Sequence, residues 1–305
     1  MSDRSKGVWA MVAACVIWGL SPLYYKLLAH VAPLEVLAHR TLWSLALFGA
    51  ILLARRRLGA VAGLLRSWRG AGAVGFAAAM ISFNWFLYIL AIQIGHTVQA
   101  SLGYFIFPLV AVLLGVAGFG ERLPRGQWLA VAIAALAVLV LSLGRGRVPW
   151  ISLLLAASFG LYGLAKKRTA AGPIVSVTAE VALLAPLAAL WLWGVHMQGW
   201  QGVVSRPGGV FGRDLGDSLL LVFSGPMTAS PLILFSYASR RISLSTVGVI
   251  QYLNPTLQFL CAVLVFGEPF GAVRVVAFAM IWLALAIYSL QAVALERAAS
   301  SLSHN

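Results

Sequence analysis

The chain has 305 residues, of which 61% are hydrophobic and 10% are charged, and its mean hydropathy is +0.93. A soluble domain of this length could not bury so much apolar surface, so the composition excludes a water-soluble globular protein and indicates one that spans a lipid bilayer. The formal net charge of +14 does not indicate nucleic acid binding, because the basic residues lie in predicted loops and at helix ends, apart from Lys26 and Arg40 within or near spans.

Ten apolar segments are long enough to cross a bilayer core about 30 Å thick, in which a helix rises about 1.5 Å per residue. None alternates with the period of two that a membrane strand requires, so the predicted fold class is an all-α membrane protein with ten transmembrane helices. In chain order the segments are residues 7–29, 33–54, 72–93, 98–118, 126–144, 149–165, 173–195, 217–238, 244–266 and 271–293.

The basic residues also predict the orientation in the membrane. They gather in the loops on the side of the N-terminus, as in Arg55, Arg56 and Arg57 after the second segment, and the positive-inside rule places that side in the cytoplasm. Both termini are then cytoplasmic. The first segment, residues 7–29, is too long for the apolar part of a cleaved signal and is expected to be a retained helix.

The chain carries an internal repeat. Residues 101–108, SLGYFIFP, align without a gap with residues 248–255, GVIQYLNP, which lie 147 positions further on. Each half holds five predicted spans, and an odd number makes the second half enter the membrane from the opposite side. We therefore predict two inverted five-helix repeats, residues 1–145 and 146–305.

The tripeptide Phe-Gly-Glu occurs at the same place in both halves. Gly120 and Gly267 are expected to end their helices, because glycine adopts the left-handed cap conformation. Glu121 and Glu268 follow and are expected to begin the next helix, where a carboxylate complements the exposed amides. A site for a coupling ion is the alternative role of these two carboxylates.

These motifs resemble those of a known transporter family. The helix with Pro and Phe-Gly-Glu in each half resembles the EamA branch of the drug/metabolite transporter superfamily. Four stretches resemble its RarD family more closely: SLGYFIFP at 101–108, WGLSP at 18–22, AHR at 38–40 and IQYLNP at 250–255. The resemblance covers residues 7–293 and implies a ten-helix carrier of small organic molecules in the bacterial inner membrane; RarD members have been linked with chloramphenicol resistance. The family pattern would place Asn at Phe107, as the mate of Asn254.

Several spans present aromatic or polar side chains on one helical face, because positions three and seven apart share a face. The faces are Trp18, Ser21 and Tyr25, their repeat mates Phe159, Tyr162 and Lys166, the amide stripe Gln251, Asn254 and Gln258, and its mates Tyr104, Phe107 and Ala111. Unpaired amides facing lipid would be costly, so the stripe faces either a substrate cavity or a partner helix. The paired aromatic and amide faces favour the cavity.

The third span adds Asn84 and Tyr88, four positions apart on one face. Its Met80 and Trp85 are more typical of packing, and Gln93 at the following turn is expected to have a surface role. The predicted substrate-binding residues are Trp18, Tyr25, Arg40, Asn84, Tyr88, Tyr104, Tyr162, Gln251 and Asn254.

Two ionisable groups lie well inside predicted spans, where such groups are functional candidates. Arg40 lies seven residues, about 10 Å, into the second span. It could bind an anionic substrate group or pair with a cluster of carbonyl groups. Its repeat mate is Glu180, the candidate for proton coupling, although exchange or facilitated diffusion would need no such group.

No motif supports catalysis, and the five histidines are scattered without metal-ligand spacing, so no enzyme activity, cofactor or metal is expected. The leading hypothesis is a secondary transporter whose partners are a small organic metabolite or drug and the lipid bilayer. It would work by alternating access around a central cavity between the repeats. The alternative is a membrane-embedded sensor or enzyme that uses the same cavity without transport.

Overall fold

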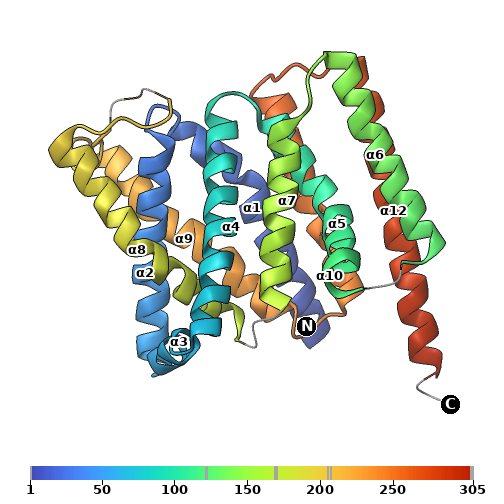
Figure 1. The fold of residues 1–305 in the computed structure, drawn as a ribbon, viewed down its shortest axis with the longest axis horizontal. Coiled ribbons are helices and arrows are strands. Elements are labelled where there is room, and N and C mark those ends of the chain that lie inside the picture. The colour runs from blue at the N-terminus through green and yellow to red at the C-terminus, as the bar shows by residue number, and fades with distance from the viewer. Residues whose placement is uncertain (1, 121–122, 168–170, 205, 207, 303–305) are drawn as a thin grey trace.

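The computed structural model describes residues 2–120, 123–167, 171–204, 206 and 208–302, and this part of the chain is mainly helical (Figure 1). The helices of the first half are α1 Asp3–Leu27, α2 Pro33–Ala54, α3 Leu58–Leu65, α4 Trp68–Gln93, α5 Thr97–Phe119 and α6 Arg125–Arg145. Those of the second half are α7 Trp150–Lys167, α8 Pro173–Gln198, α9 Leu215–Ala238, α10 Leu244–Gln251, α11 Leu253–Leu260, the π-helical turn η1 Cys261–Val265 and α12 Ala272–Leu302.

Within the described residues, nine helical stretches are long and apolar enough to cross a membrane, and α7 is a shorter apolar helix. The prediction of an all-α membrane protein is confirmed. The short helix α3, which the sequence did not predict, lies between α2 and α4 and buries none of its side chains. Its position between the basic turns at Arg55 and Arg66 suits the surface of a membrane.

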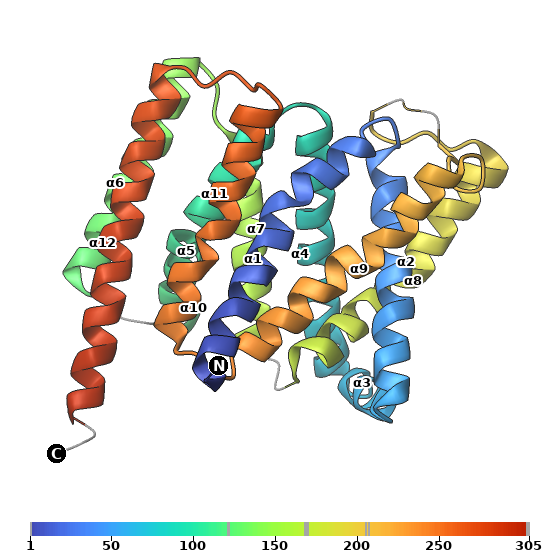
Figure 2. The same cartoon turned by 180° about the vertical axis from the view of Figure 1, so that it is seen from behind.

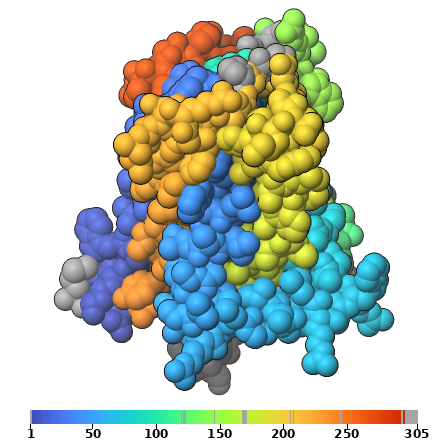
Figure 3. Space-filling view, turned by 90° about the vertical axis from the view of Figure 1, so that its left-hand side faces the viewer, coloured from blue at the N-terminus to red at the C-terminus, as the bar shows by residue number. Residues whose placement is uncertain are grey.

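The helices lie side by side, and α1 begins at the same end of the bundle at which α12 ends (Figures 1 and 2). α1 packs on α9 and α11, while α7 packs on α4 and α5. α2 lies between α8 and α9, as Figure 3 shows from the side of the molecule. α6 and α12 pack on each other at the opposite edge of the bundle (Figure 2). The two halves of the chain therefore interleave.

Glycines allow some of these helices to approach closely. A Cβ atom added at Gly103 of α5 would lie 2.8 Å from the carbonyl oxygen of Ser152 and 2.9 Å from Cβ of Leu155, both on α7. A Cβ atom added at Gly225 of α9 would lie 2.7 Å from the carbonyl oxygen of Trp43 on α2. Both contacts are too short for any side chain, so these helix pairs depend on glycine.

The predicted span at residues 244–266 is not one regular helix but divides into α10, α11 and η1. Pro255 has no N–H group to continue the helical hydrogen bonds. The helix changes at Tyr252, whose N–H bonds to the Val249 carbonyl only three residues back, at 3.3 Å. The repeat mate Pro108 lies inside the continuous helix α5. This helix is therefore continuous in the first half, and its equivalent in the second half is broken.

The glycines of the repeated tripeptide behave as predicted, with Gly120 at φ 64° and Gly267 at φ 63°. Glu268, however, does not act on the helix that follows it. Its carboxylate accepts hydrogen bonds from the N–H groups of Thr97, at 2.6 Å, and of Val98, at 2.9 Å, where α5 begins. The carboxylate complements a helix N-terminus, as expected, but one in the other half of the chain. Its repeat mate at position 121 lies outside the described residues.

Two polar side chains tie the loops at the end of the bundle where α5 begins. Gln93 is buried, so the predicted surface role is wrong: its Nε2 donates to the Leu28 carbonyl at 2.9 Å, and its Oε1 accepts from Arg206 Nη1 at 2.6 Å. Buried Glu35 accepts hydrogen bonds from the N–H groups of residues 209–211, at 2.8 to 3.4 Å. The loop between α8 and α9 is therefore attached to α2 and α4.

Replacing Gly103 with Ala should lower the melting temperature of the purified protein in detergent. The added methyl group would push α5 away from α7, which outweighs the roughly 1 kcal/mol by which Ala favours a helix over Gly. Gly75→Ala is the matched control, because an added Cβ there meets no atom within 4 Å, and it should leave the melting temperature unchanged or raise it. Equal melting temperatures for the Gly103→Ala variant and the wild type would contradict the close contact.

Candidate functional site

A cavity of about 380 Å³ lies inside the bundle and is lined by helices from both halves. Aromatic rings make up much of its wall, and hydroxyl, amide and charged groups are set among them. The polar, charged and aromatic lining residues are Trp18, Ser21, Tyr25, Arg40, Asn84, Trp85, Tyr88, Tyr104, Phe159, Tyr162, Lys166, Ser176, Thr228, Phe235, Gln251, Asn254 and Gln258.

The cavity extends toward the end of the bundle at which α1 begins. It reaches Lys166, Ala171 and Pro173, where α7 ends and α8 begins. Toward the other end, its wall joins a cluster of buried apolar side chains that includes the fully buried Leu28 and Ile92. The packing therefore closes the cavity at one end of the bundle and not at the other.

Asn84 of α4 is the centre of a hydrogen-bonded group on the cavity wall. Its Nδ2 donates to the Leu155 carbonyl at 2.9 Å and to Ser158 Oγ at 3.0 Å, both on α7. Its Oδ1 accepts from the Tyr104 hydroxyl at 2.8 Å. Asn84 is fully buried, and these bonds hold α4, α5 and α7 in one arrangement.

A run of aromatic rings follows the wall from α1 to α7. Tyr25 meets Tyr88 edge to face with ring centroids 5.9 Å apart, and Tyr88 meets Tyr104 in the same way at 5.6 Å. Tyr104 contacts Phe159 at 5.8 Å, and Phe159 stacks on Tyr162 at 5.9 Å. Such pairs have defined geometry, so the run gives the cavity an apolar, shaped surface with hydroxyl groups on it.

Arg40 lies on the cavity wall and is 7% exposed. Its Nε donates to Thr228 Oγ1 at 2.9 Å, and its Nη1 donates to the Tyr25 hydroxyl at 2.7 Å. The guanidinium carbon lies 4.0 Å from the ring centroid of Trp85, a distance typical of a cation–π contact. Among the described residues, hydroxyl groups and aromatic rings hold Arg40, and not the cluster of carbonyl groups that the sequence left open as a partner.

Lys166 and Glu180 form an ion pair on the opposite half. Lys166 Nζ lies 2.6 Å from Glu180 Oε1 and also donates to Ser176 Oγ. The Tyr162 hydroxyl donates to Glu180 Oε2 at 3.1 Å, and Ser176 Oγ donates to Oε1 at 3.0 Å. Glu180 is 1% exposed, so its charge is neutralised by Lys166 and by hydrogen bonds rather than by water.

The amide stripe of α10 and α11 faces the cavity. Gln251, Asn254 and Gln258 all line it, and Gln258 Nε2 donates to Asn254 Oδ1 at 2.8 Å. Gln258 Oε1 is buried and has no hydrogen-bond partner among the described residues. An acceptor of this kind is costly unless water or a ligand reaches it, so the stripe is equipped to bond to the contents of the cavity.

The chain matches known proteins over nearly its whole length. The model of the EamA-like transporter family matches residues 5–143. "Protein RarD" of Streptomyces exfoliatus is 45% identical over 297 residues, which cover 97% of this chain and 92% of that protein. The chain belongs to the RarD family of EamA-like transporters.

A second relative agrees with this membership, and a solved structure shares the fold. "Uncharacterized transporter YojE" of Bacillus subtilis (strain 168) is 39% identical over 303 residues, which cover 98% of this chain and 99% of that protein. A protein crystal structure with 22% sequence identity aligns at a TM-score of 0.59 and covers 94% of this chain and 97% of its own. At that identity, the crystal structure shows a shared fold and no more.

All nine predicted substrate-binding residues of this RarD-family chain lie on the cavity wall, which brings together side chains from both halves. Their role in binding stays a prediction. Trp85 lines the cavity, whereas Met80 is not among the lining residues. Glu180 lies behind the wall and reaches the cavity through Lys166.

Sequence reasoning missed Thr228 and Ser176, which hold Arg40 and Lys166 on the wall of the cavity. Hydroxyl residues are common on helices that pack in membranes, so neither stands out by composition. The available signal for Thr228 was its position after Met227, the repeat mate of Met80. A search for Ser and Thr residues next to positions that have a matching residue in the other repeat would have found Thr228.

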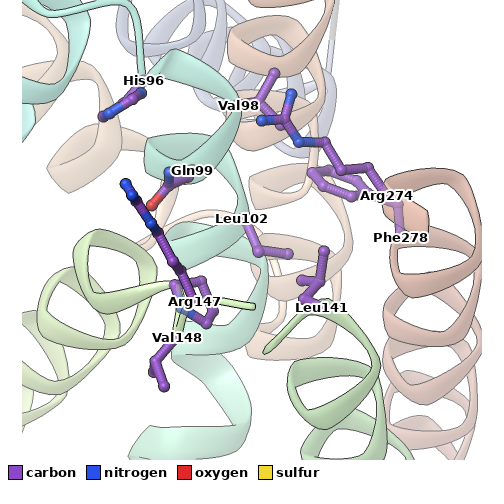
Figure 4. Close-up of a pocket in the computed structure, with 10 residues that line it drawn as sticks. His96, Val98, Gln99, Leu102, Leu141, Arg147, Val148, Arg274 and Phe278 are labelled. Carbon is purple, nitrogen blue, oxygen red and sulfur yellow. The ribbon is translucent and has the colours of Figure 1, made fainter. Parts of the chain in front are cut away.

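A second cavity of about 310 Å³ lies toward the other end of the bundle, between α5, α6 and α12 (Figure 4). Arg147, Arg274 and His96 give its wall a basic character, and the Arg147 side chain runs beside Gln99 in the close-up. This cavity lies at the edge formed by α6 and α12 and has few aromatic lining residues. The larger cavity between the halves is the candidate site of this RarD-family protein.

Among the described residues, Glu35, His39 and His196 come closest to a metal-binding set, with one ligand atom of each within 4.8 Å of the others. Both Glu35 oxygens already accept hydrogen bonds from loop amides, and the His39 ring lies 4.6 Å from the Phe211 ring. These contacts explain the cluster as an attachment of the loop between α8 and α9. A role in binding metal does not follow from them.

Replacing Lys166 alone with Met should destabilise the protein strongly. The Glu180 carboxylate would stay buried without its counter-charge, a change that typically costs about 3–5 kcal/mol. The double variant Lys166→Met/Glu180→Gln removes both charges and should recover most of the lost stability. Thermal melts of the two single variants and the double variant measure this coupling. Additive losses in the double variant would mean that the pair is not coupled.

Proposed function

We propose that this membrane transporter is a secondary carrier that moves a small organic metabolite or drug across the bacterial inner membrane by alternating access. The observation that carries the proposal is the cavity of about 380 Å³, lined with polar groups from both halves. Its volume falls in the range of about 300–1,000 Å³ common for small-molecule sites. The buried and unpartnered Oε1 of Gln258 supports a cavity that receives a polar ligand.

We further propose that the halves, residues 1–145 and 146–305, are inverted repeats. The sequence offset pairs α1 with α7, α4 with α9, and α5 with α10 and α11. α1 packs on α9 and α11, and α7 packs on α4 and α5, which is the same arrangement with the halves exchanged. A structure in which two halves exchange equivalent contacts can open toward either side of the membrane.

A pair of glycine contacts supports the same symmetry. A Cβ atom added at Gly19 of α1 would lie 2.7 Å from Leu257 Cβ on α11. A Cβ atom added at Gly160 of α7 would lie 3.3 Å from Val110 Cγ1 on α5. Gly19 and Gly160 are repeat mates, 141 positions apart, and Val110 and Leu257 are mates at 147. Equivalent residues therefore make the equivalent close contact twice, each time between the two halves.

The cavity in this conformation reaches the end of the bundle at which α1 begins. The basic loops at this end support a cytoplasmic location for it and for both termini, which makes the proposed conformation inward-facing. Rocking of one half against the other would close this mouth and open the packed end around Leu28 and Ile92. The substrate would then meet the opposite side of the membrane.

Proton coupling would depend on Glu180, because it is the one acidic side chain joined to the cavity through a described lining residue. Its ion pair with Lys166 would have to open for the carboxylate to take up a proton. Exchange of one substrate for another needs no such step. A pH gradient across proteoliposomes separates these two modes, because only the coupled carrier would accumulate substrate in response to it.

The alternative function is a membrane-embedded sensor or enzyme with the same cavity. On the described cavity wall Ser176 is bonded to Lys166, but that lysine is the cation of the ion pair with Glu180 rather than a free base, and the relatives named above include a protein named as a transporter. Both observations favour transport over catalysis.

Filling the cavity should abolish transport without unfolding the protein. Met227 lines the cavity, and Met227→Trp would occupy its space with an indole ring. Leu290→Trp is the matched control, because Leu290 on α12 is 72% exposed at the outer face of the protein. Uptake and counterflow of a panel of amino acids, nucleosides and aromatic drugs, measured in proteoliposomes, give the readout.

The wild type and the Leu290→Trp variant should transport the same members of the panel, and the Met227→Trp variant should transport none. A variant with a filled cavity that still transports at the normal rate would contradict this site. A wild type that transports no member of the panel would count against transport itself.

A further inference from the structure

The guanidinium group of Arg40 has no acidic partner among the described residues. It contacts the hydroxyl groups of Thr228 and Tyr25 and the ring of Trp85, all of them formally neutral. No hydrogen bond from its Nη2 to a described residue occurs. A charge that is 7% exposed in the interior of a membrane protein calls for compensation, because removing it from water is costly.

Six acidic side chains are described, those at positions 121 and 296 lying outside the described part, and all six are engaged elsewhere. Glu180 is paired with Lys166, and the carboxylates of Glu35 and Glu268 bind backbone N–H groups of a loop and a helix. The remaining three lie near chain or helix ends: Asp3 pairs with Lys6, Asp214 caps α9, and Asp217 pairs with His30. None of them is available to neutralise Arg40 in this conformation.

Comparison of the two repeats makes the uncompensated charge of Arg40 more distinct. Tyr25 and Lys166 are repeat mates at an offset of 141, and Arg40 and Glu180 are mates at 140. Each half therefore places a contact between the same two positions, Tyr25 with Arg40 in one and Lys166 with Glu180 in the other. The second half neutralises its charges internally, and the first half does not. The described cavity wall and the group behind it thus carry one uncompensated positive charge.

We propose that the substrate is a small organic anion whose carboxylate binds Arg40 and whose apolar body lies against the aromatic wall. This inference rests on the proposed transport function and names the class of its substrate. The hydroxyl groups of Tyr25 and Thr228 fix the plane of the guanidinium, which leaves Nη2 for a charge-assisted hydrogen bond to the carboxylate. The rings of Tyr88 and Phe159 offer apolar surface in the same cavity.

A purely structural role is the competing explanation for Arg40. The residue lies on α2 and contacts α1, α4 and α9, so it could act as a brace that needs no ligand. A brace would affect stability in the absence of ligand and would not discriminate between ligands by charge. An anion site predicts that acids bind better than neutral molecules of the same shape. Charge discrimination therefore separates the two roles.

The test uses the full-length protein in detergent with matched pairs of probes. Each pair is an acid and its neutral amide: benzoate and benzamide, 3-phenylpropanoate and 3-phenylpropanamide, indole-3-acetate and indole-3-acetamide, and octanoate and octanamide. 2-Phenylethylamine serves as the cationic counterpart. Thermal shifts and calorimetric titrations at constant ionic strength report binding, because a ligand of the folded state raises the melting temperature.

We expect at least one acid to bind about tenfold or more tightly than its amide, which corresponds to about 1.4 kcal/mol. Arg40→Gln should remove this preference, and Arg40→Lys should retain part of it, because a Lys keeps the charge but not the two-pronged geometry. Arg241→Gln is the matched control. Arg241 lies outside the cavity lining and stacks on Tyr237 at 3.6 Å, so the acid preference should persist in this variant.

A panel in which no acid is preferred over its amide would overturn the inference, and so would an acid preference that survives Arg40→Gln. The wild-type comparison decides the matter even if the Arg40 variants fail to fold. Transport in proteoliposomes keeps the two proposals apart. If amides are transported as fast as acids, the carrier function is supported and the anionic substrate is contradicted. If acids bind but nothing is transported, the anion site is supported and the carrier function is contradicted.

Discussion

A polar group in the hydrocarbon core of a membrane has no water to bond with, so it must find its partner inside the protein or in a cavity. Asn84 satisfies this constraint with three hydrogen bonds to α5 and α7. Glu180 satisfies it with a lysine, a tyrosine and a serine. Because these partners come from different helices, the polar groups determine which helices meet, and they concentrate where the cavity lies.

Close contacts at small residues also determine which helices pack together. Apolar side chains attract one another little more than they attract lipid, so helices associate where glycine lets their backbones approach. Gly19 and Gly160 make such contacts at equivalent places in the two halves, with α11 and α5 respectively. These close contacts hold α1 on α11 and α7 on α5, each joining a helix of the first half to one of the second, and the cavity is lined by helices of both halves as well. Rocking of one half against the other would therefore have to shift these contacts together with the cavity wall.

The sequence predicted the helices and the cavity wall because both follow from short-range periodicity. Apolar length marks the spans, and positions three and seven apart in each span mark a face, so the faces that carry Trp18, Tyr25 and Gln251 could be predicted to line a cavity. Gln93 and Glu268 were misjudged because their partners, Arg206 and the start of α5, lie 113 and 171 positions away. No local pattern encodes a contact of that kind.

The charges at the cavity, those of the Lys166–Glu180 pair and of Arg40, give a physical reason why the conformational change would depend on bound substrate. With Lys166 and Glu180 paired, Arg40 leaves the empty cavity with a net positive charge. Closing both mouths around an uncompensated charge would be unfavourable, because the surroundings have a low dielectric constant. A bound carboxylate on Arg40 would make the contents neutral and lower that barrier. A carrier built in this way would change conformation readily when loaded and reluctantly when empty, which is the behaviour of an exchanger and requires no proton.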